Sequence, residues 1–217
     1  MRMEKAALMK NNNDYSYYML NKPAGYITAK KDEKHNVVMD FFKDLNNPSL
    51  NPVGRLDIDT EGLLFITDDG KWNNDLMQPD NHIEKTYFFW ALGEIGETQK
   101  KYINDGVTLA GSKIPAKPAV IKTEKTDKLC NLPEYARGKR YDIIKKNKPE
   151  SPIVSGRIII TEGKKRQVKR MLKVIGCYCI YLRREAIGEV VLDRNLAYGE
   201  YRKLTKEEME VLDLKKR

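Results

Sequence analysis

Hydrophobic and polar positions along the chain alternate between the periods of strands and helices. Apolar runs or period-two alternation predict strands at residues 15–20, 62–67, 84–92, 107–109, 153–161, 177–182 and 189–193. Apolar residues spaced three and four apart predict helices at 37–45 and 168–175, with shorter ones at 71–78 and 97–105. Turn signals lie too close together for regular parallel crossovers. We therefore predict an α+β fold with a mixed, mainly antiparallel sheet and flanking helices.

The helix predicted after Glu162-Gly163 has two different sides. One is an apolar stripe of Val168, Met171, Leu172 and Ile175, and the other is basic. From residue 157 to residue 184 we count nine basic residues and one acid, so a net +8 of the chain's +9 lies in this segment. Such a concentration favours a surface for a polyanion, either nucleic acid or acidic membrane, although a solvated helix face is the alternative.

Composition excludes several classes of protein. No apolar run approaches twenty residues, so we expect neither a membrane span nor a secretory signal. We therefore expect the protein to be cytoplasmic. Three cysteines form an odd set whose only close pair is C-x-C, which fits neither a disulfide framework nor usual zinc spacing. The two histidines, His35 and His82, are isolated, so a Ser-His-Asp or histidine-metal enzyme is not expected.

Five carboxylates lie in "GRLDIDTEGLLFITDDG", residues 54–70. Asp68 and Asp69 precede Gly70, where Asp is expected for structural reasons alone. Asp59 is suited to satisfying loop backbone, and Glu61 has no distinguishing feature.

Asp57 differs from these acids because Arg55 precedes it by two residues, in a loop that leads into a core strand. An extended segment places Arg55 and Asp57 on one face and Leu56 on the other. The nearby positive charge would keep the carboxylate ionised. Such an acid is either a nucleophile or base, or one end of a structural ion pair, and the pattern alone leaves both open.

Six motifs occur in order along the chain. They are "LNKPAG" (20–25), "GRLDIDTEGLLFITDDG" (54–70), "KTY" (85–87), "EGKKRQVKRML" (162–172), "LRREAIGEVVLD" (182–193) and "GEYRKLT" (199–205). Through them the chain, from Tyr17 onward, resembles the RsuA-type pseudouridine synthases, a bacterial family that isomerises uridines in ribosomal RNA. The resemblance implies the pseudouridine synthase fold, with two lobes around a central active-site cleft.

The resemblance also implies roles for individual residues. Asp57 would be the catalytic carboxylate, which attacks the target uridine so that the glycosidic bond breaks and the uracil rotates to rejoin ribose through carbon 5. Tyr87 would stack beside the base as a candidate for proton transfer, and Lys169 would pair with Asp57. No cofactor or metal is needed for this chemistry, and we expect none.

Five residues are expected to bind the substrate. Arg55 would help to flip the nucleotide and brace Asp57, and Leu182 would pack under the base. Arg166 stands where many relatives have His and is assigned only a phosphate contact. Arg170 and Arg183 belong to the basic segment that would hold RNA phosphates.

The resemblance bears on domains and targets as well. We expect residues 1–14 to be a flexible tail and 15–217 the catalytic domain. Relatives often carry an S4 domain before "NKP", but only about twenty residues precede it here, so we expect a single-domain, monomeric member. Its shortness favours 23S ribosomal RNA as the target, with 16S ribosomal RNA or tRNA as alternatives. The loop 134–150 is expected to influence site choice.

Two hypotheses of other classes stay open. One is a non-catalytic RNA-binding or ribosome-assembly factor that reuses the fold. Retention of Asp57, Tyr87 and Lys169 together argues against it, because binding needs basic patches and no buried acid. The other is a DNA-binding protein, which charge alone supports.

Overall fold

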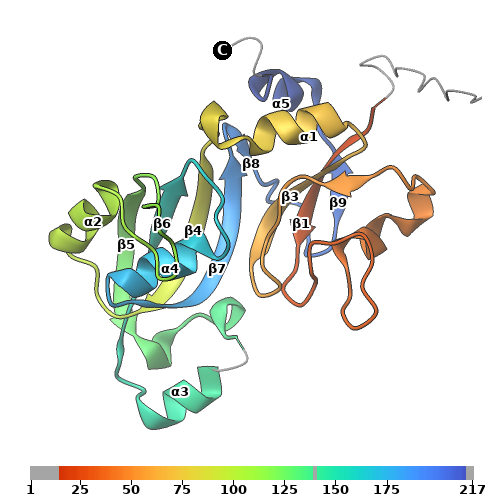
Figure 1. Cartoon of the computed structure of the whole chain (residues 1–217). Coiled ribbons are helices and arrows are strands. Elements are labelled where there is room, and N and C mark those ends of the chain that lie inside the picture. The colour runs from red at the N-terminus through yellow and green to blue at the C-terminus, as the bar shows by residue number, and fades with distance from the viewer. Residues whose placement is uncertain (1–14, 139–140, 214–217) are drawn as a thin grey trace, which may run out of the picture.

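A single mixed sheet runs through the molecule (Figure 1). The computed structural model describes residues 15–138 and 141–213. Within these residues nine strands form one sheet in the order β5-β6-β4-β7-β3-β1-β9, with β2 paired to β3 and β8 to β7. The strands are β1 (Tyr17–Lys22), β2 (Asn51–Pro52), β3 (Glu61–Thr67), β4 (Lys85–Leu92), β5 (Val120–Lys128), β6 (Pro152–Ile160), β7 (Tyr178–Ile187), β8 (Val190–Val191) and β9 (Tyr201–Lys203). Every pair is antiparallel except β3 with β7, which confirms the predicted α+β class.

Helices flank the sheet (Figure 1). The α-helices are α1 (Gly70–Met77), α2 (Glu97–Asn104), α3 (Tyr141–Asn147), α4 (Gln167–Val174) and α5 (Lys206–Val211). Short 3-10 helices are η2 (Val38–Leu45), η3 (Pro79–Asn81), η4 (Leu129–Asn131) and η5 (Glu134–Ala136). Helix α2 packs against β5, and α4 packs against β7 on the same face, while α3 lies at one end of the sheet.

The sheet divides into two lobes where β3 meets β7. Only two residue pairs join these strands, Glu61 with Arg183 and Gly62 with Arg184. Gly62 has a φ of +98°, and a Cβ there would lie 2.2 Å from the carbonyl oxygen of Arg184, so only glycine permits this approach. We call β1, β2, β3 and β9 the small lobe and β4 to β8 the large lobe. The loop that carries Asp57 directly precedes β3, at their junction.

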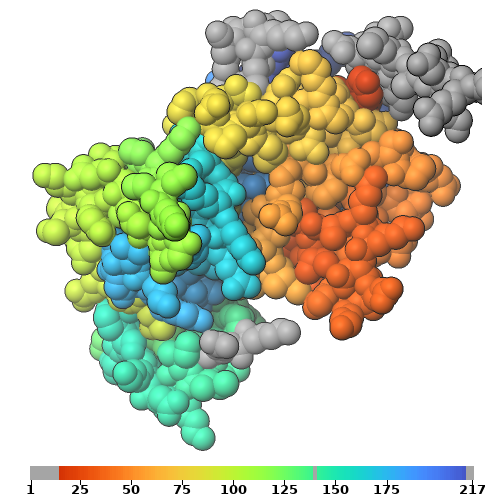
Figure 2. All heavy atoms as spheres, viewed as in Figure 1, coloured from red at the N-terminus to blue at the C-terminus, as the bar shows by residue number. Residues whose placement is uncertain are grey.

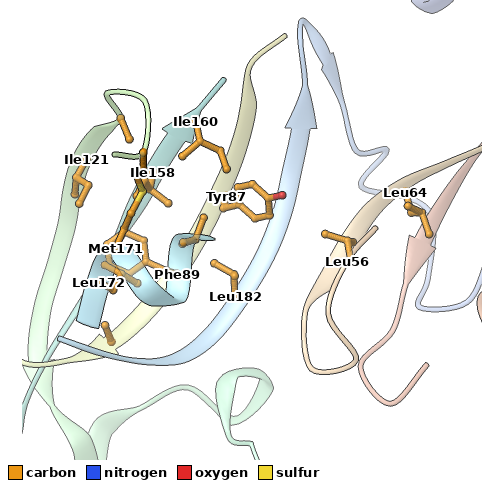
Figure 3. Close-up of a cluster of buried hydrophobic side chains, with 14 of the residues drawn as sticks. Leu56, Leu64, Tyr87, Phe89, Ile121, Ile158, Ile160, Met171, Leu172 and Leu182 are labelled. Carbon is orange, nitrogen blue, oxygen red and sulfur yellow. The ribbon is translucent and has the colours of Figure 1, made fainter. Parts of the chain in front are cut away.

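The main core lies between the large-lobe sheet and α4 and continues into the small lobe, where Leu56 and Leu64 belong to it (Figure 3). Alternate residues of β4, including Tyr87 and Phe89, face this core, as period-two alternation requires. The predicted helical stripe is confirmed, because the side chains of Val168, Met171, Leu172 and Ile175 are all buried. The opposite face of the same strands packs Trp90 and Tyr181 against residues 129–144.

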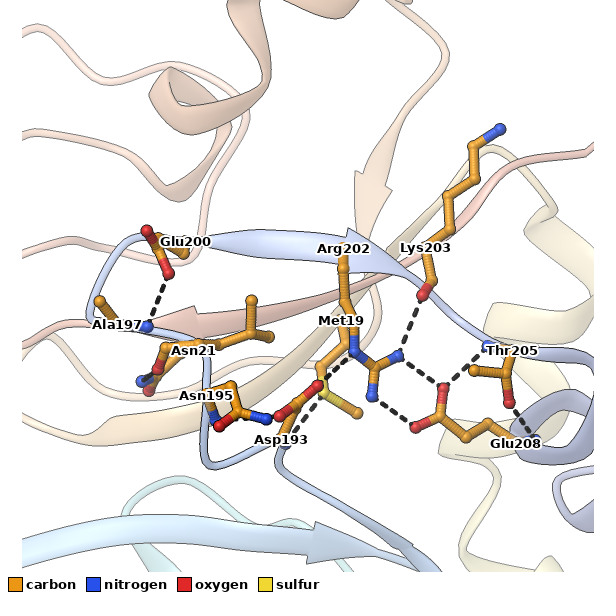
Figure 4. A network of polar contacts seen from close by, with 11 residues as sticks. Met19, Asn21, Asp193, Asn195, Ala197, Glu200, Arg202, Lys203, Thr205 and Glu208 are labelled. Carbon is orange, nitrogen blue, oxygen red and sulfur yellow. Dashed lines mark hydrogen bonds and ion pairs between the residues drawn. The ribbon is translucent and has the colours of Figure 1, made fainter.

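Arg202 of β9 links the residues of the "GEYRKLT" motif to Asp193 and Glu208 through hydrogen bonds (Figure 4). Its Nε donates to Asp193 Oδ2 at 2.7 Å, and two further nitrogens donate to the carboxylate of Glu208 at 2.7 and 2.8 Å. Thr205 and Glu208 form a capping box at the start of α5. The "GEYRKLT" residues therefore connect β9 to the last helix of the described chain.

Several sequence predictions were wrong in detail. Residues 107–109 form no strand, although Val107 and Leu109 are buried, because the backbone turns back so that the Ala116 amide donates to the Val107 carbonyl. The loop 134–150 contains η5 and α3, and β8 is only two residues long. Strands β2, β5 and β9 were not predicted. The predicted tail, residues 1–14, lies outside the described residues.

Candidate active site

The loop that carries Asp57 is braced by the segment that follows β1. The amide of Gly25 donates to the carbonyl of Ile58 at 2.7 Å. The Thr28 hydroxyl donates to the Leu56 carbonyl at 2.9 Å and accepts from the Leu56 amide at 3.1 Å. Leu56 is buried in the main core, as its place opposite Asp57 predicted. The residue before Asp57 is thereby fixed by both backbone and side chain.

Lys22, at the end of β1, provides the strongest brace. Its side chain is fully buried, and Nζ donates to the carbonyls of Pro23 at 2.9 Å, Asp57 at 3.2 Å and Thr60 at 2.8 Å. Burial lowers the pKa of Lys22 to about 8, against the opposing attraction of nearby carboxylates. A buried ammonium therefore holds the backbone of Asp57 from within the protein.

Lys169, on α4, meets Asp57 from the other lobe. Its Nζ lies 3.4 Å from Asp57 Oδ2, and it also donates a hydrogen bond to Asp59. Both side chains of the Asp57–Lys169 pair are mostly buried, with 27% and 20% exposure. Burial raises the pKa of Asp59, but the hydrogen bond and charge of Lys169 outweigh it and leave that pKa below its usual value. The predicted pairing of residues 57 and 169 is present in the structure.

Tyr87 faces the same space from the floor of the large lobe. Its side chain is 8% exposed, and its hydroxyl points out of the main core toward the small lobe (Figure 3). Tyr87 and Asp57 line one small pocket of about 60 Å³ between the lobes. Figure 2 shows this face of the molecule hollowed between the orange small lobe and the cyan and blue segments of the large lobe.

Three of the predicted substrate-binding residues line this pocket. They are Arg55, Arg166 and Leu182. Arg166 is exposed and immediately precedes α4 with a left-handed φ of 52°, while Leu182 is buried in the same cluster as Tyr87. Arg55 is exposed and forms no ion pair with any residue that the structure describes. The expected bracing of Asp57 by Arg55 is therefore absent, and Lys169 supplies the cation instead.

The two remaining predicted contacts lie elsewhere. Arg170 donates to the carbonyls of Ala110 and Lys165, at the outer edge of α4. Arg183 lies between Leu182 and Arg184 on β7, so its side chain projects from the opposite face of the sheet, 5.9 Å from the ring centroid of Tyr198. The structure therefore places Arg183 on the face of the sheet opposite Tyr87, and its phosphate contact stays a prediction.

A family model described as RNA pseudouridylate synthase matches residues 16–173. The chain belongs to the RNA pseudouridylate synthase family. It is therefore an RNA pseudouridine synthase, as the six motifs predicted.

Relatives and solved structures agree with this assignment. The chain is 37% identical to ribosomal small subunit pseudouridine synthase A of Yersinia pestis, over 89% of this chain and 71% of the relative. It is 35% identical to the protein of that name from Escherichia coli K12, over 89% and 72%. A crystal structure of pseudouridylate synthase matches with a TM-score of 0.73 at 33% identity, covering 92% of this chain and 74% of that one.

Four residues near the synthase cleft escaped sequence analysis. Lys22 lies just after the predicted strand 15–20, in the "LNKPAG" motif, and was assigned no role, while Asp59 was interpreted as a loop acid. Lys85 and Arg184 are buried beside Tyr87. The one available signal was period-two alternation, which places Lys85 on the face of Tyr87.

The other acids of the 54–70 stretch have structural partners. Asp69 Oδ1 accepts from the amides of Lys71 and Trp72 at 3.0 Å and caps α1, while Glu61 accepts from the Tyr181 hydroxyl at 2.8 Å. In residues 15–138 and 141–213 no group of three or more His, Cys, Asp or Glu is arranged to hold a metal ion. In that same part of the chain no helix is long and apolar enough to cross a bilayer.

Proposed function

We propose that this synthase isomerises one uridine of small-subunit ribosomal RNA, with Asp57 as the nucleophile. The observation that supports it best is a carboxylate at the junction of two lobes, held by Lys169 through its side chain and by Lys22 through its backbone. An acid fixed at both ends is suited to attack at one defined atom. A non-catalytic RNA-binding protein would have no use for such an arrangement.

In the proposed reaction Asp57 attacks the ribose of the target nucleotide and the glycosidic bond breaks. The freed uracil rotates between Leu182 and Tyr87, which line the pocket beside Asp57. A carbon–carbon bond then joins uracil carbon 5 to ribose, and the carboxylate is released. Lys169 orients the carboxylate and offsets its charge before attack.

The target in this proposal differs from the one expected from the sequence. The shortness of the chain favoured large-subunit RNA, but the relatives at 35–37% identity are named for the small subunit. Length is a weak guide to target, because a neighbouring domain changes affinity without changing the catalytic cleft. We therefore replace 23S by 16S ribosomal RNA.

Basic residues around α4 would bind the RNA backbone. Of the nine basic residues between positions 157 and 184, six surround this helix, namely Lys164, Lys165, Arg166, Lys169, Arg170 and Lys173. The other three have partners within the protein. Arg157 pairs with Glu124 and Glu185, Arg183 lies near the Tyr198 ring, and Arg184 is buried beside Tyr87. Binding to phosphates through this surface would weaken with salt.

Three further expectations are carried into the proposal. Residues 15–217 form the catalytic domain, the protein acts as a monomer, and it acts in the cytoplasm. The continuous sheet from β1 to β9 supports the first, and relatives named for the ribosome support the last.

Release of tritium from RNA labelled at uracil carbon 5 tests the proposed function, because the isomerisation replaces that hydrogen. The wild-type protein should release tritium from small-subunit transcripts, and Asp57→Asn should release none while still binding RNA. Asp75→Asn is a matched control, since Asp75 pairs with Lys71 on the surface of α1. Full release by a purified Asp57→Asn protein would overturn the proposal.

A further inference from the structure

Two buried cationic side chains, Arg184 and Lys85, lie near Tyr87, and no carboxylate of the described residues pairs with either of them. The side chain of Arg184 is 3% exposed and that of Lys85 is 5% exposed. Neither forms an ion pair with any residue in the described part of the chain. Burial, followed by the charge of Arg184, lowers the pKa of Lys85 to about 8. The cost of burying two neighbouring cations is thus not offset by an acid.

Arg184 is held rigidly against Tyr87. Its Nε donates to the carbonyl of Leu63 in β3 at 2.7 Å, and Nη1 donates to the Tyr87 hydroxyl oxygen at 3.4 Å. The guanidinium carbon lies 5.9 Å from the centroid of the Tyr87 ring. The remaining nitrogen, Nη2, is buried and has no hydrogen-bond partner among the described residues.

The direction of this contact limits what the phenol can do. A guanidinium has only donors, so the Tyr87 oxygen must accept from Arg184 and cannot donate to it. The phenol hydrogen is left to point elsewhere, and Tyr87 borders the pocket that contains Asp57. Positive charge behind the oxygen favours any step in which that oxygen becomes negative.

We infer that Arg184, supported by Lys85, is a positioning residue that stabilises negative charge on the Tyr87 oxygen during the last proton transfer of the isomerisation. The inference rests on the proposed function. After ribose is joined to carbon 5, that carbon still carries its hydrogen. A Tyr87 phenolate, formed by loss of the phenol proton to water, takes this hydrogen as a proton.

Electrons and protons balance in this step. The electron pair of the broken C5–H bond forms the C5=C6 double bond. The C6=N1 pair returns to N1, which takes a proton from water, while the phenol is restored. One proton has passed to water and one has returned, so the product is an isomer of the substrate.

The competing explanation is that Arg184 only fastens β7 to β3 through Leu63. The two roles can be separated. A more acidic phenol needs less stabilisation by a cation, so it should restore the rate if Arg184 stabilises negative charge. If Arg184 only joins β7 to β3, the acidity of the phenol should not change the rate of the variant. Replacement of Tyr87 by a ring-fluorinated tyrosine, introduced by stop-codon suppression, provides the acidic phenol.

Single-turnover tritium release from labelled small-subunit RNA is measured for Arg184→Gln and Arg184→Lys. Loss of the guanidinium behind the Tyr87 oxygen removes a charge that stabilises negative charge there, so we expect rates lower by about tenfold or more. Fluorinated tyrosine at position 87 stabilises that negative charge through its ring instead, and should restore both variants to within about threefold of wild type. Arg157→Gln is the matched control, because Arg157 lies on the opposite face with its own acids, and it should be unaffected.

RNA binding by filter retention and thermal unfolding accompany each rate. Should Arg184→Gln fail to fold, Arg184→Lys with the fluorinated residue decides the question, because lysine keeps the charge but cannot reach both Leu63 and Tyr87. A normal rate in a folded variant, or no rescue by fluorination, would show that Arg184 is only a fastener. Failure of the proposed function looks different, because the wild-type protein would then release no tritium.

Discussion

Replacement of Lys22 by Met should separate catalysis from stability. Methionine has a similar length and fills the same buried volume, but it removes the ammonium that bonds the carbonyls of Pro23, Asp57 and Thr60. The substitution acts on the backbone of the catalytic loop, while the Asp57 carboxylate and its partner Lys169 are unchanged. We expect a modest loss of stability and a large loss of activity.

The magnitude follows from two opposing effects. Three carbonyls lose a buried donor, which costs roughly 1–3 kcal/mol each. Against this, the pKa of Lys22 falls from 10.5 to about 8 in the folded protein, so at pH 7 removal of the charge returns about 3 kcal/mol. The net loss in free energy of unfolding should be about 3 kcal/mol. A loop displaced by about 1 Å should lower kcat by roughly 100-fold.

Urea denaturation followed by tryptophan fluorescence gives the stability, and single-turnover tritium release gives the rate. Lys100→Met is the matched control, because Lys100 pairs with Glu97 on α2, away from the cleft. A folded Lys22→Met protein with the wild-type rate would refute the idea that Lys22 positions Asp57. A loss in free energy of unfolding far above about 3 kcal/mol would show that removing the buried charge of Lys22 does not offset the lost hydrogen bonds.

Three further substitutions test other parts of the account. Lys169→Met should lower tritium release by about 100-fold with near-normal RNA retention on filters, because a charged partner of the nucleophile is lost, and Lys169→Arg should recover part of the rate. Lys85 has a folded pKa of about 8, so above pH 8 the unfolded chain binds the extra proton and the free energy of unfolding rises with pH. Between pH 7 and 10 wild type should therefore gain about 2 kcal/mol relative to Lys85→Met in urea denaturation, and equal slopes would contradict the burial. Gly62→Ala should cost about 3 kcal/mol or more in thermal unfolding, because its Cβ would meet a β7 carbonyl at 2.2 Å, whereas Gly70→Ala, with open space around it, should be harmless.

Sequence pattern was sufficient for much of the fold because most elements bury one face. Strands β3, β4 and β6 and helix α4 have apolar periods that local physics determines. Strand β5 was missed because it lies at the sheet edge and reads "VIKTEKTDK", with mostly exposed polar side chains. Its hydrogen bonds to β6 are a tertiary property that hydropathy does not encode.

The candidate site was predictable only where a motif identified a side chain. Asp57 and Lys169 are 112 residues apart, and the resemblance alone predicted their pairing, which the fold displays. Lys22 and Arg184 act through backbone carbonyls and a phenol oxygen, partners that a sequence does not reveal. The face on which Arg183 lies was not predicted, because a run of basic residues gives net charge and not the direction of each side chain.

In the proposed function Asp57 makes one pseudouridine in small-subunit ribosomal RNA. Pseudouridine mapping across all ribosomal RNA of cells that lack this protein, and of the same cells supplied with wild type or Asp57→Ala, tests it most directly. One small-subunit uridine should lose its modification on deletion, regain it with wild type and stay unmodified with Asp57→Ala. Restoration by Asp57→Ala, or loss of a large-subunit position instead, would contradict the account.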